Sequence, residues 1–205
     1  SERKRKKIDY RTAGQMATLA LPEGNMENGQ EREGGIPHLR RRAYTRINAV
    51  YPEDLGRIWA HATFFMVGEN VSKHPELFRQ IVEAGHQVGN HTYNHWGGFK
   101  HSTKAYSANT EKANRLINAH LFRPPHGWML WEQYFWLGRK YRIVMWDLVT
   151  RDYSKWLTAE DVLKNVKRYT RNGSIITFHD SLKSIDKLRY ALPEALKWLK
   201  EQGMI

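Results

Sequence analysis

From residue 62 onward, short apolar runs alternate with stretches of helical periodicity, and no other feature constrains the fold of this chain as strongly. The apolar runs lie at residues 62–67, 87–90, 121–123, 143–146 and 174–178. The helical stretches include residues 103–117 and 131–141, a helix that begins with a capping box at Thr158 and Asp161, and a last helix through Leu192, Leu196 and Leu199. Such alternation is typical of parallel strands joined by crossover helices, so it predicts an α/β fold.

Length and composition are consistent with one globular domain. A chain of 205 residues with 40% hydrophobic content can bury a sizeable core. No apolar run approaches the roughly 20 residues that a membrane-spanning helix needs. No signal segment opens the chain, but it starts at Ser1 rather than Met, so the bacterial cell envelope and the cytoplasm both stay open as compartments. The absence of cysteine excludes disulfides and thiolate metal sites.

The formal net charge of +12 favours anionic partners, and nucleic acid is one such class. The charge is spread along the chain, since residues 1–61 hold 12 Lys or Arg against 8 Asp or Glu. The dense basic runs, residues 3–7 and 40–42, lack the interleaved aromatic residues that stack on bases. A solvated basic surface therefore explains the charge better than a nucleic-acid interface, and an acidic glycan or an envelope surface would also fit it.

Polar residues follow the predicted strands at the point where each strand ends. They are His91, His95, Arg123, His126, Asp147, Asp152, His179 and Asp180. The carboxyl ends of parallel strands meet at one rim, so a closing barrel would bring these side chains together. Two histidines four residues apart are by themselves only half a zinc site, and packing or capping explains such a pair equally well.

The order of these segments resembles four of the five motifs of the polysaccharide deacetylase family. The segments are His-Thr-Tyr-Asn-His at 91–95, Arg-Pro-Pro-His-Gly at 123–127, residues 149–153, and Phe-His-Asp at 178–180. Members of that family are NodB-like domains that remove acetyl groups from chitin, peptidoglycan and related glycans. The resemblance implies a distorted (β/α) barrel over residues 62–205 and the metal-dependent hydrolysis of N-acetyl groups from a polysaccharide.

The resemblance also implies roles for individual residues. The pair His91 and His95 binds a divalent metal, usually zinc, in that family. Arg123 orients the catalytic base, and His179 is the general acid toward the leaving amine. The substrate groove is lined by the following candidates: Pro124, Pro125, His126 and Gly127 as one wall, and Trp146 and Leu182 at the acetyl pocket.

Amide hydrolysis explains why these residue types are needed. A metal with open coordination positions activates water and polarises the acetyl carbonyl, a carboxylate takes a proton from the water, and an imidazolium protonates the departing nitrogen. The chain offers three participants, namely His91, His95 and His179. The base and the third metal ligand are an aspartate pair in the family's first motif, Thr-Phe-Asp-Asp-Gly-Pro, and residues 1–61 contain no such pair.

The fourth motif also departs from the family pattern, which is close to Asp-x-x-Asp-Trp. The corresponding residues, 149–153, read Val-Thr-Arg-Asp-Tyr. The carboxylate that would tune His179 is missing in that register, so Asp147 or Asp152 is expected to substitute for it.

A frameshift would explain the unusual head. Residues 34–46 can be encoded by codons whose second reading frame spells Ala-Val-Tyr-Leu-Thr-Phe-Asp-Asp-Gly-Pro-Ile-Pro, which contains the absent motif. We therefore hypothesise that residues 1–61 are a misframed translation of an ordinary deacetylase head. The alternative is an unrelated head whose codons permit this match by chance. The coding DNA upstream of Ala62 separates the two.

A misframed head carries no selected hydrophobic pattern, so residues 1–61 are expected to be disordered. The barrel would then lack its first strand and first helix, which would leave an open sheet edge. Three functional interpretations follow. They are a polysaccharide deacetylase impaired by the missing aspartates, a glycan-binding pseudoenzyme that uses the same groove, and a basic nucleic-acid-binding protein.

Overall fold

The computed structural model describes residues 15–20, 62–181 and 183–205. The strands in these residues are β1 (Gln15–Ala20), β2 (Thr63–Met66), β3 (Gln87–Asn90), β4 (Leu121–Phe122), β5 (Arg142–Ile143), β6 (Leu148–Val149) and β7 (Ile175–Asp180). The α-helices are α1 (Gly68–Lys73), α2 (Pro75–Glu83), α3 (Thr103–Ile117), α4 (Trp131–Gly138), α5 (Ala159–Tyr169) and α6 (Ile185–Glu201). Two short 3-10 turns, η2 (Gly98–Lys100) and η3 (Pro125–Gly127), lie in the loops.

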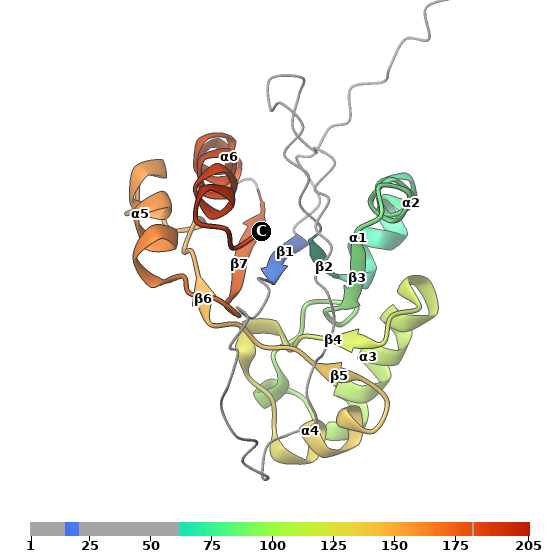
Figure 1. The fold of residues 1–205 in the computed structure, drawn as a ribbon. Helices are drawn as coiled ribbons and strands as arrows, with labels where there is room; N and C mark the ends of the chain where they lie inside the picture. The colour runs from blue at the N-terminus through green and yellow to red at the C-terminus, as the bar shows by residue number, and fades with distance from the viewer. Residues whose placement is uncertain (1–14, 21–61, 182) are drawn as a thin grey trace, which may run out of the picture.

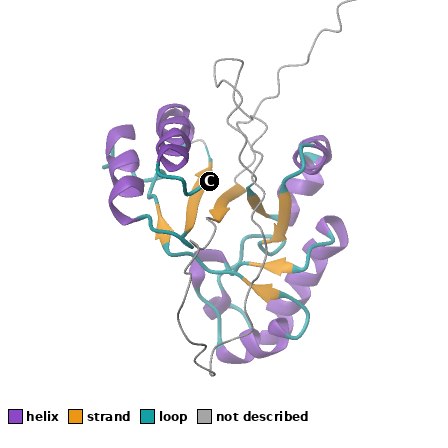
Figure 2. Cartoon of the chain, in the orientation of Figure 1, coloured by secondary structure: helices purple, strands orange, loops and turns teal. Residues whose placement is uncertain are grey.

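The strands of the described residues form one curved sheet with the helices outside it (Figures 1 and 2). Its order is β5-β4-β3-β2-β1-β7-β6. The pairs from β2 to β5 are parallel, as is the pair of β6 and β7. The α/β fold with parallel strands that the sequence predicts is therefore the observed one, and every strand except β1 points toward the same rim.

The place beside β2 that we expected to be open is filled by β1. This strand runs antiparallel to both neighbours, with Ala17 opposite Phe64 of β2 and Phe178 of β7. Two facing strand edges carry rows of unpaired N–H and C=O groups, and an extended segment between them satisfies both rows. The remainder of the predicted disordered or misframed head, and the place of the missing first helix, lie outside the described residues.

Local sequence signals set the two best-predicted helices. The helix α3 has the predicted bounds, with the Ser102 hydroxyl accepting a hydrogen bond from the N–H of Ala105 and left-handed Asn118 ending it. The capping box predicted before α5 is present, because the side chains of Thr158 and Asp161 each accept a hydrogen bond from the other's backbone N–H.

The region after α4 differs from the prediction. The helix ends at Gly138 rather than at residue 141, and the strand predicted at 143–146 is only β5. The carbonyls of Val144 and Met145 accept hydrogen bonds from the side chain of Arg123 instead of from a neighbouring strand. A buried arginine thus replaces the ladder that would have extended β5.

The buried apolar side chains form separate clusters between the sheet and the helices outside it. One lies between β6, β7 and the helices α5 and α6, and includes Val162, Ile176 and Leu196. Another joins β2 to α1, α2 and α3 around Met66 and Ile81. None of the helices in the described part of the chain is both long and apolar enough to cross a membrane.

Candidate active site

The residues singled out in the sequence lie at the carboxyl ends of the parallel strands. His91 follows β3, Arg123 follows β4, and Asp152 lies just beyond β6. His179 is the next-to-last residue of β7. The backbone N–H of Arg123 still donates to the carbonyl of Asn90 at 3.0 Å, so strand pairing continues up to the rim. The sheet thus carries these four side chains to one edge.

The buried ring of His91 has one engaged and one unengaged nitrogen. Its Nδ1 lies 2.6 Å from the carbonyl oxygen of Arg123, so Nδ1 carries the proton and donates it. Burial, and then the charge of His95, hold the pKa of His91 well below its usual range. The ring is neutral near pH 7, and its buried Nε2 has no hydrogen-bond partner among the described residues. A fixed tautomer with an available Nε2 is the usual state of a metal-binding histidine.

His95 lies beside His91 in a loop with a strained backbone. The two ring centroids are 4.9 Å apart. His95 and Thr92 have φ angles of 56° and 63°, which are uncommon for residues other than glycine and especially so for a β-branched one. The side chain of Asn109 supports the loop by accepting a hydrogen bond from the N–H of Tyr93 at 2.9 Å. Strain that is held in place by its surroundings is frequent at functional sites.

The three histidines of the predicted site come together. Protein atoms packed around the ring, and then the charges of His126 and His179, lower the pKa of His95 to about 4. His179 also contributes to the lowered pKa of His91, whose main cause is burial. Strand pairing gives the same placement, because Met16 of β1 lies opposite both Phe65 of β2 and His179 of β7, and the N–H of His91 donates to the carbonyl of Met66 at 3.0 Å. The ring of His126 contacts His95, with centroids 4.9 Å apart.

Two imidazoles supply two of the ligands that a divalent metal requires. Within residues 15–20, 62–181 and 183–205, no group of three or more His, Cys, Asp or Glu comes together closely enough to hold a metal ion. The carboxylate ligand expected from the first motif would belong to the head, most of which is not described. The described residues therefore fit a metal as part of a coordination shell, with His91 and His95 as its imidazole ligands.

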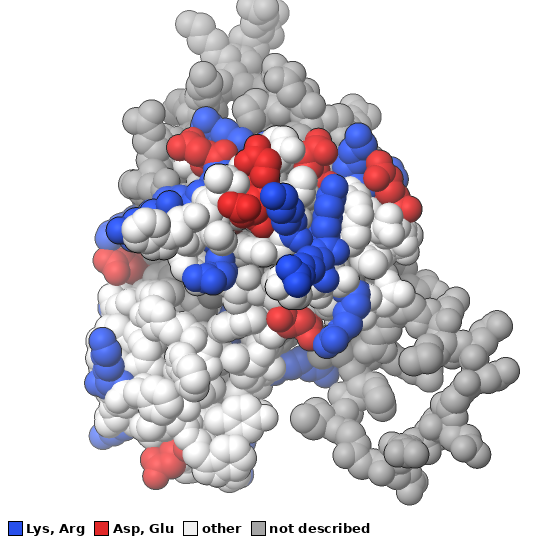
Figure 3. Space-filling view, turned by 90° about the vertical axis from the view of Figure 1, so that its left-hand side faces the viewer, with Lys and Arg blue, Asp and Glu red and all other residues white. Residues whose placement is uncertain are grey.

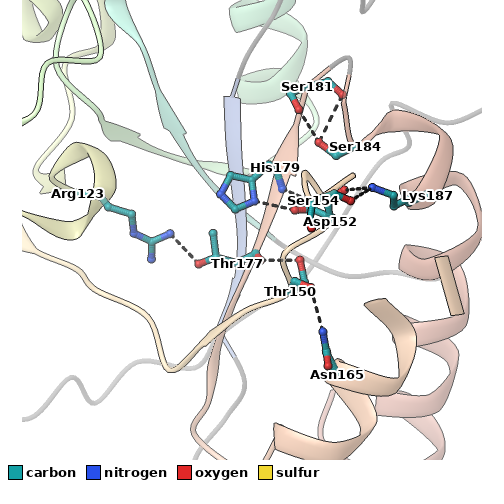
Figure 4. A network of polar contacts seen from close by, with 10 residues as sticks. All are labelled: Arg123, Thr150, Asp152, Ser154, Asn165, Thr177, His179, Ser181, Ser184 and Lys187. Carbon is teal, nitrogen blue, oxygen red and sulfur yellow. Dashed lines mark hydrogen bonds and ion pairs between the residues drawn. The ribbon is translucent and has the colours of Figure 1, made fainter. Parts of the chain in front are cut away.

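His179 is paired with a buried carboxylate (Figure 4). Its Nδ1 lies 2.7 Å from Oδ1 of Asp152, and its backbone N–H donates to Oδ2 at 2.6 Å. The Nζ of Lys187 on α6 donates to the carbonyls of Asp152, at 3.0 Å, and of Ser154, so the loop that carries the carboxylate is held against the helix. With Asp152 accepting the Nδ1 proton, the Nε2 of His179 is available for proton exchange with a substrate.

Of the two candidate tuning carboxylates, Asp152 is the one that contacts His179. The Oδ2 of Asp147 instead accepts a hydrogen bond from the N–H of Ile175 at 2.8 Å, and Arg171 lies 3.8 Å from its Oδ1. Ile175 begins β7, and His179 follows four residues later, about 13 Å along an extended strand. Asp147 is therefore a cap at the start of β7 and does not lie at the rim.

Arg123 is a buried cation that connects the two halves of the sheet. Its Nε and Nη2 donate to the carbonyls of Val144 and Met145 at 3.0 and 2.7 Å, and its Nη1 donates to Oγ1 of Thr177 on β7 at 3.1 Å. The guanidinium lies 4.2 Å from the ring centroid of Phe65. Burial lowers the pKa of Arg123 to about 9, so it stays charged at pH 7. These contacts join the segment after β5 to strand β7. They are additional to the role that the resemblance implies for Arg123, which is to orient a catalytic base.

Replacement of Arg123 by alanine should lower the free energy of unfolding by about 2–4 kcal/mol, because two carbonyls lose charge-assisted hydrogen bonds. Arg123→Lys should recover only part of this loss, since an ammonium cannot reproduce the planar fork. Urea unfolding measures the effect. Arg79→Ala, at an exposed position of α2, is the matched control and should change the free energy by less than about 0.5 kcal/mol. An equally small effect at Arg123 would show that it does not hold the fold.

The Arg-Pro-Pro-His-Gly segment forms a tight wall at the rim. Pro124 and Pro125 are buried, whereas His126 is exposed. Gly127 has a φ of 76°, and a Cβ there would lie 2.5 Å from Cη2 of Trp146. Glycine is required at this position both for its backbone conformation and for the close packing of the indole. The structure thus places Trp146 directly against the wall.

Leu182, the other candidate for the acetyl pocket, lies outside the described residues.

Sequence reasoning missed the supporting residues Asn109, Lys187 and Thr177, because single polar residues within helices and strands carry no motif. It also missed Tyr153, whose ring centroid lies 4.7 Å from that of His179. Its position next to Asp152 in the fourth motif was the signal that could have indicated it.

The face formed by α5 and α6 does not carry a continuous basic stripe. Figure 3 looks at this face, and its Lys and Arg side chains are interspersed with Asp and Glu. Nucleic-acid interfaces usually gather cations along one groove or helix. This face therefore resembles an ordinary solvated surface.

Comparisons with known proteins agree with the motif order. The family model for polysaccharide deacetylase matches residues 55–133, which include the metal-side histidines but not His179. A peptidoglycan-N-acetylglucosamine deacetylase of Bacillus cereus is 31% identical in an alignment of 167 positions that covers 74% of this chain and 59% of that protein. A solved peptidoglycan N-acetylglucosamine deacetylase is 30% identical, with a TM-score of 0.60 over 69% of each chain.

A third similar protein is described as a pseudoenzyme. The wild-type protein, from Bacillus anthracis, is 28% identical to this chain, with a TM-score of 0.64 over 69% of this chain and 51% of that one. A mutant of it is described as having restored enzymatic activity. The chain thus spans between half and about 60% of the length of the first relatives it matches.

Proposed function

Since the chain belongs to the polysaccharide deacetylase family, we propose that its rim hydrolyses N-acetyl groups of a glycan such as peptidoglycan, chitin or an exopolysaccharide, and does so slowly. The observation that carries this proposal is the convergence of His91, His95 and His179, with the Nε2 of His91 buried and without a partner among the described residues. Three unrelated histidines would not be expected to lie together at the strand ends.

A divalent metal, held by His91 and His95 with a further ligand from elsewhere, would supply Lewis acidity toward the acetyl carbonyl and the attacking water. The low pKa values of both rings favour this role, because a protonated imidazole cannot bind a metal. The wall at Pro124–Gly127 and the indole of Trp146 would bound the groove in which the acetyl group lies.

His179 would act as the general acid. Its Nδ1 is engaged by Asp152, so the proton that leaves the ring comes from Nε2. That proton passes to the amide nitrogen as the bond between nitrogen and the acetyl carbon breaks, and water supplies the oxygen of the released acetate. The buried carboxylate of Asp152 compensates the charge of the imidazolium and fixes the ring.

A glycan-binding pseudoenzyme is the second candidate. The similar pseudoenzyme from Bacillus anthracis favours it, as does the lack of an aspartate pair in residues 1–61. In this case the same groove would bind the glycan without cleaving the amide.

Acetate release from N-acetylglucosamine oligomers and from peptidoglycan, with and without added zinc, tests the two candidates. We expect zinc-dependent release that His179→Ala reduces at least about a hundredfold. His120→Ala, at an exposed histidine before β4, is the matched control and should be fully active. Retention on insoluble chitin or peptidoglycan without acetate release would indicate the pseudoenzyme. Neither release nor retention would overturn both.

A further inference from the structure

The helix α4 and the loops beside it expose an unusual number of aromatic side chains. Between 45 and 79% of each of these side chains is exposed. The set, here called the α4 aromatic face, consists of Phe99, Trp128, Trp131, Tyr134, Phe135 and Trp136. A contiguous exposed apolar surface on a small protein usually marks an interaction site.

The helix presents these rings outward while the polar side chain of Gln133 is turned inward. Gln133 is buried, and its Nε2 donates to the carbonyls of Gly98 and His101 at 2.9 and 3.0 Å. Leu137, one turn later, is buried as well. The opposite side of α4 therefore faces away from the sheet, and Figure 1 shows the helix at the periphery of the fold. Packing against residues 62–181 and 183–205 does not account for the aromatic face.

Cations surround the aromatic face. Residues 99–104 and 128–142 hold five Lys or Arg, namely Lys100, Lys104, Arg139, Lys140 and Arg142, against two acids, Glu132 and the nearby Glu111 of α3. The guanidinium of Arg139 lies 5.3 and 5.5 Å from the ring centroids of Phe135 and Trp136. Lys140 also pairs with Glu111 of α3 at 3.2 Å. The balance of charge around the rings is positive, which suits an anionic partner.

The arrangement of the rings distinguishes among anionic or apolar partners. A sugar-binding platform needs ring faces open toward a groove, but Trp131 stacks on Tyr134 with centroids 5.5 Å apart, and Arg139 covers Phe135 and Trp136. A second copy of the chain would bring like charges together. Tryptophan and tyrosine side chains next to Lys and Arg are instead typical of the boundary between an anionic membrane and water.

We propose that the α4 aromatic face docks on an anionic lipid surface, with the rings entering the headgroup region and the five cations contacting lipid phosphates. Phe99 and Trp128 belong to the loops that also carry His95 and Gly127. Docking would therefore place the rim of the candidate site beside the lipid surface. The inference does not depend on deacetylation, since it rests only on α4 and its loops.

Co-sedimentation of the full chain with lipid vesicles tests this inference. We expect binding to vesicles of phosphatidylcholine with phosphatidylglycerol, little binding to phosphatidylcholine alone, and weaker binding at high salt. The variant Trp131→Ser with Phe135→Ser should bind at least about tenfold more weakly. Trp156→Ser is the matched control, because Trp156 is 81% exposed in the loop before α5, away from α4, and should bind normally. Circular dichroism checks that each variant is folded.

Four outcomes would overturn the inference. The first is the absence of binding to both kinds of vesicle, and the second is equal vesicle binding by the wild type and the Trp131/Phe135 variant. The third is that the chain binds a glycan but no vesicles, and that only the Trp131/Phe135 variant loses glycan binding. The fourth is that the chain self-associates through the aromatic face and does not bind vesicles. The third result would reassign the face to a sugar, and the fourth to a second copy of the chain.

Discussion

Replacing residues 1–61 by a head that carries Thr-Phe-Asp-Asp-Gly-Pro should raise the rate of acetate release by about a hundredfold to ten-thousandfold, because a positioned general base typically contributes that factor to the rate. The strand of that segment would occupy the position in the sheet between β2 and β7, where β1 lies in this chain. A strand parallel to its neighbours there would end at the rim with His91 and His179. The strand β1 runs the other way, so its carboxyl end, Ala20, pairs with Ile175 at the far edge. The acetate assay, run on both proteins at equal zinc concentration, measures the gain.

The matched control is the same restored head with both aspartates changed to asparagine. This variant keeps the shape of the head and removes the carboxylates, so it should be no faster than the original chain. Equal rates for the aspartate and asparagine heads would show that a base is not what this chain lacks. The similar pseudoenzyme, a mutant of which is described as having restored activity, indicates that a protein of this fold can regain function by substitution.

The sequence predicted those parts of the fold that local patterns determine. The helix α3 and the strand β3 have their predicted bounds, and the capping box at Thr158 begins α5. These elements follow from side-chain periodicity and from hydrogen bonds within a few residues. The strand β1 was not predicted, because Gln15–Ala20 is selected by pairing with two distant edges rather than by its own pattern.

The position of the candidate residues at the strand ends was predictable, but their contacts were not. Motif order identified His91, His95 and His179, which meet at the rim because parallel strands carry them there. It could not separate Asp152 from Asp147, since the choice depends on how the loop after β6 returns to β7. Long-range contacts of this kind have no signature along the chain. The aromatic face of α4 was hidden for the same reason, because periodicity alone does not say which side of a helix is covered.

Removal of the His91 imidazole should weaken zinc binding at least about a hundredfold, because it removes one of the two proposed imidazole ligands and loss of even a supporting group can cost that much. Isothermal titration of the full chain with zinc at pH 7 measures the affinity of wild type and His91→Ala. The wild-type affinity should also change little between pH 7 and pH 6. The pKa of His95 is about 4 and that of His91 is held well below its usual range, so protons do not compete with the metal there.

His120→Ala controls for the loss of any histidine, since its side chain is exposed, and it should bind zinc as wild type does. The pH comparison adds an independent test of the pair His91 and His95. Two histidines of ordinary pKa, near 6.5, would be mostly protonated at pH 6 and would lose much of their affinity. If zinc binding falls steeply over this interval, or survives in His91→Ala, the metal is held by surface histidines rather than by the pair at 91 and 95. The unpartnered Nε2 of His91 would then need another explanation, because a buried imidazole nitrogen without a hydrogen bond is costly.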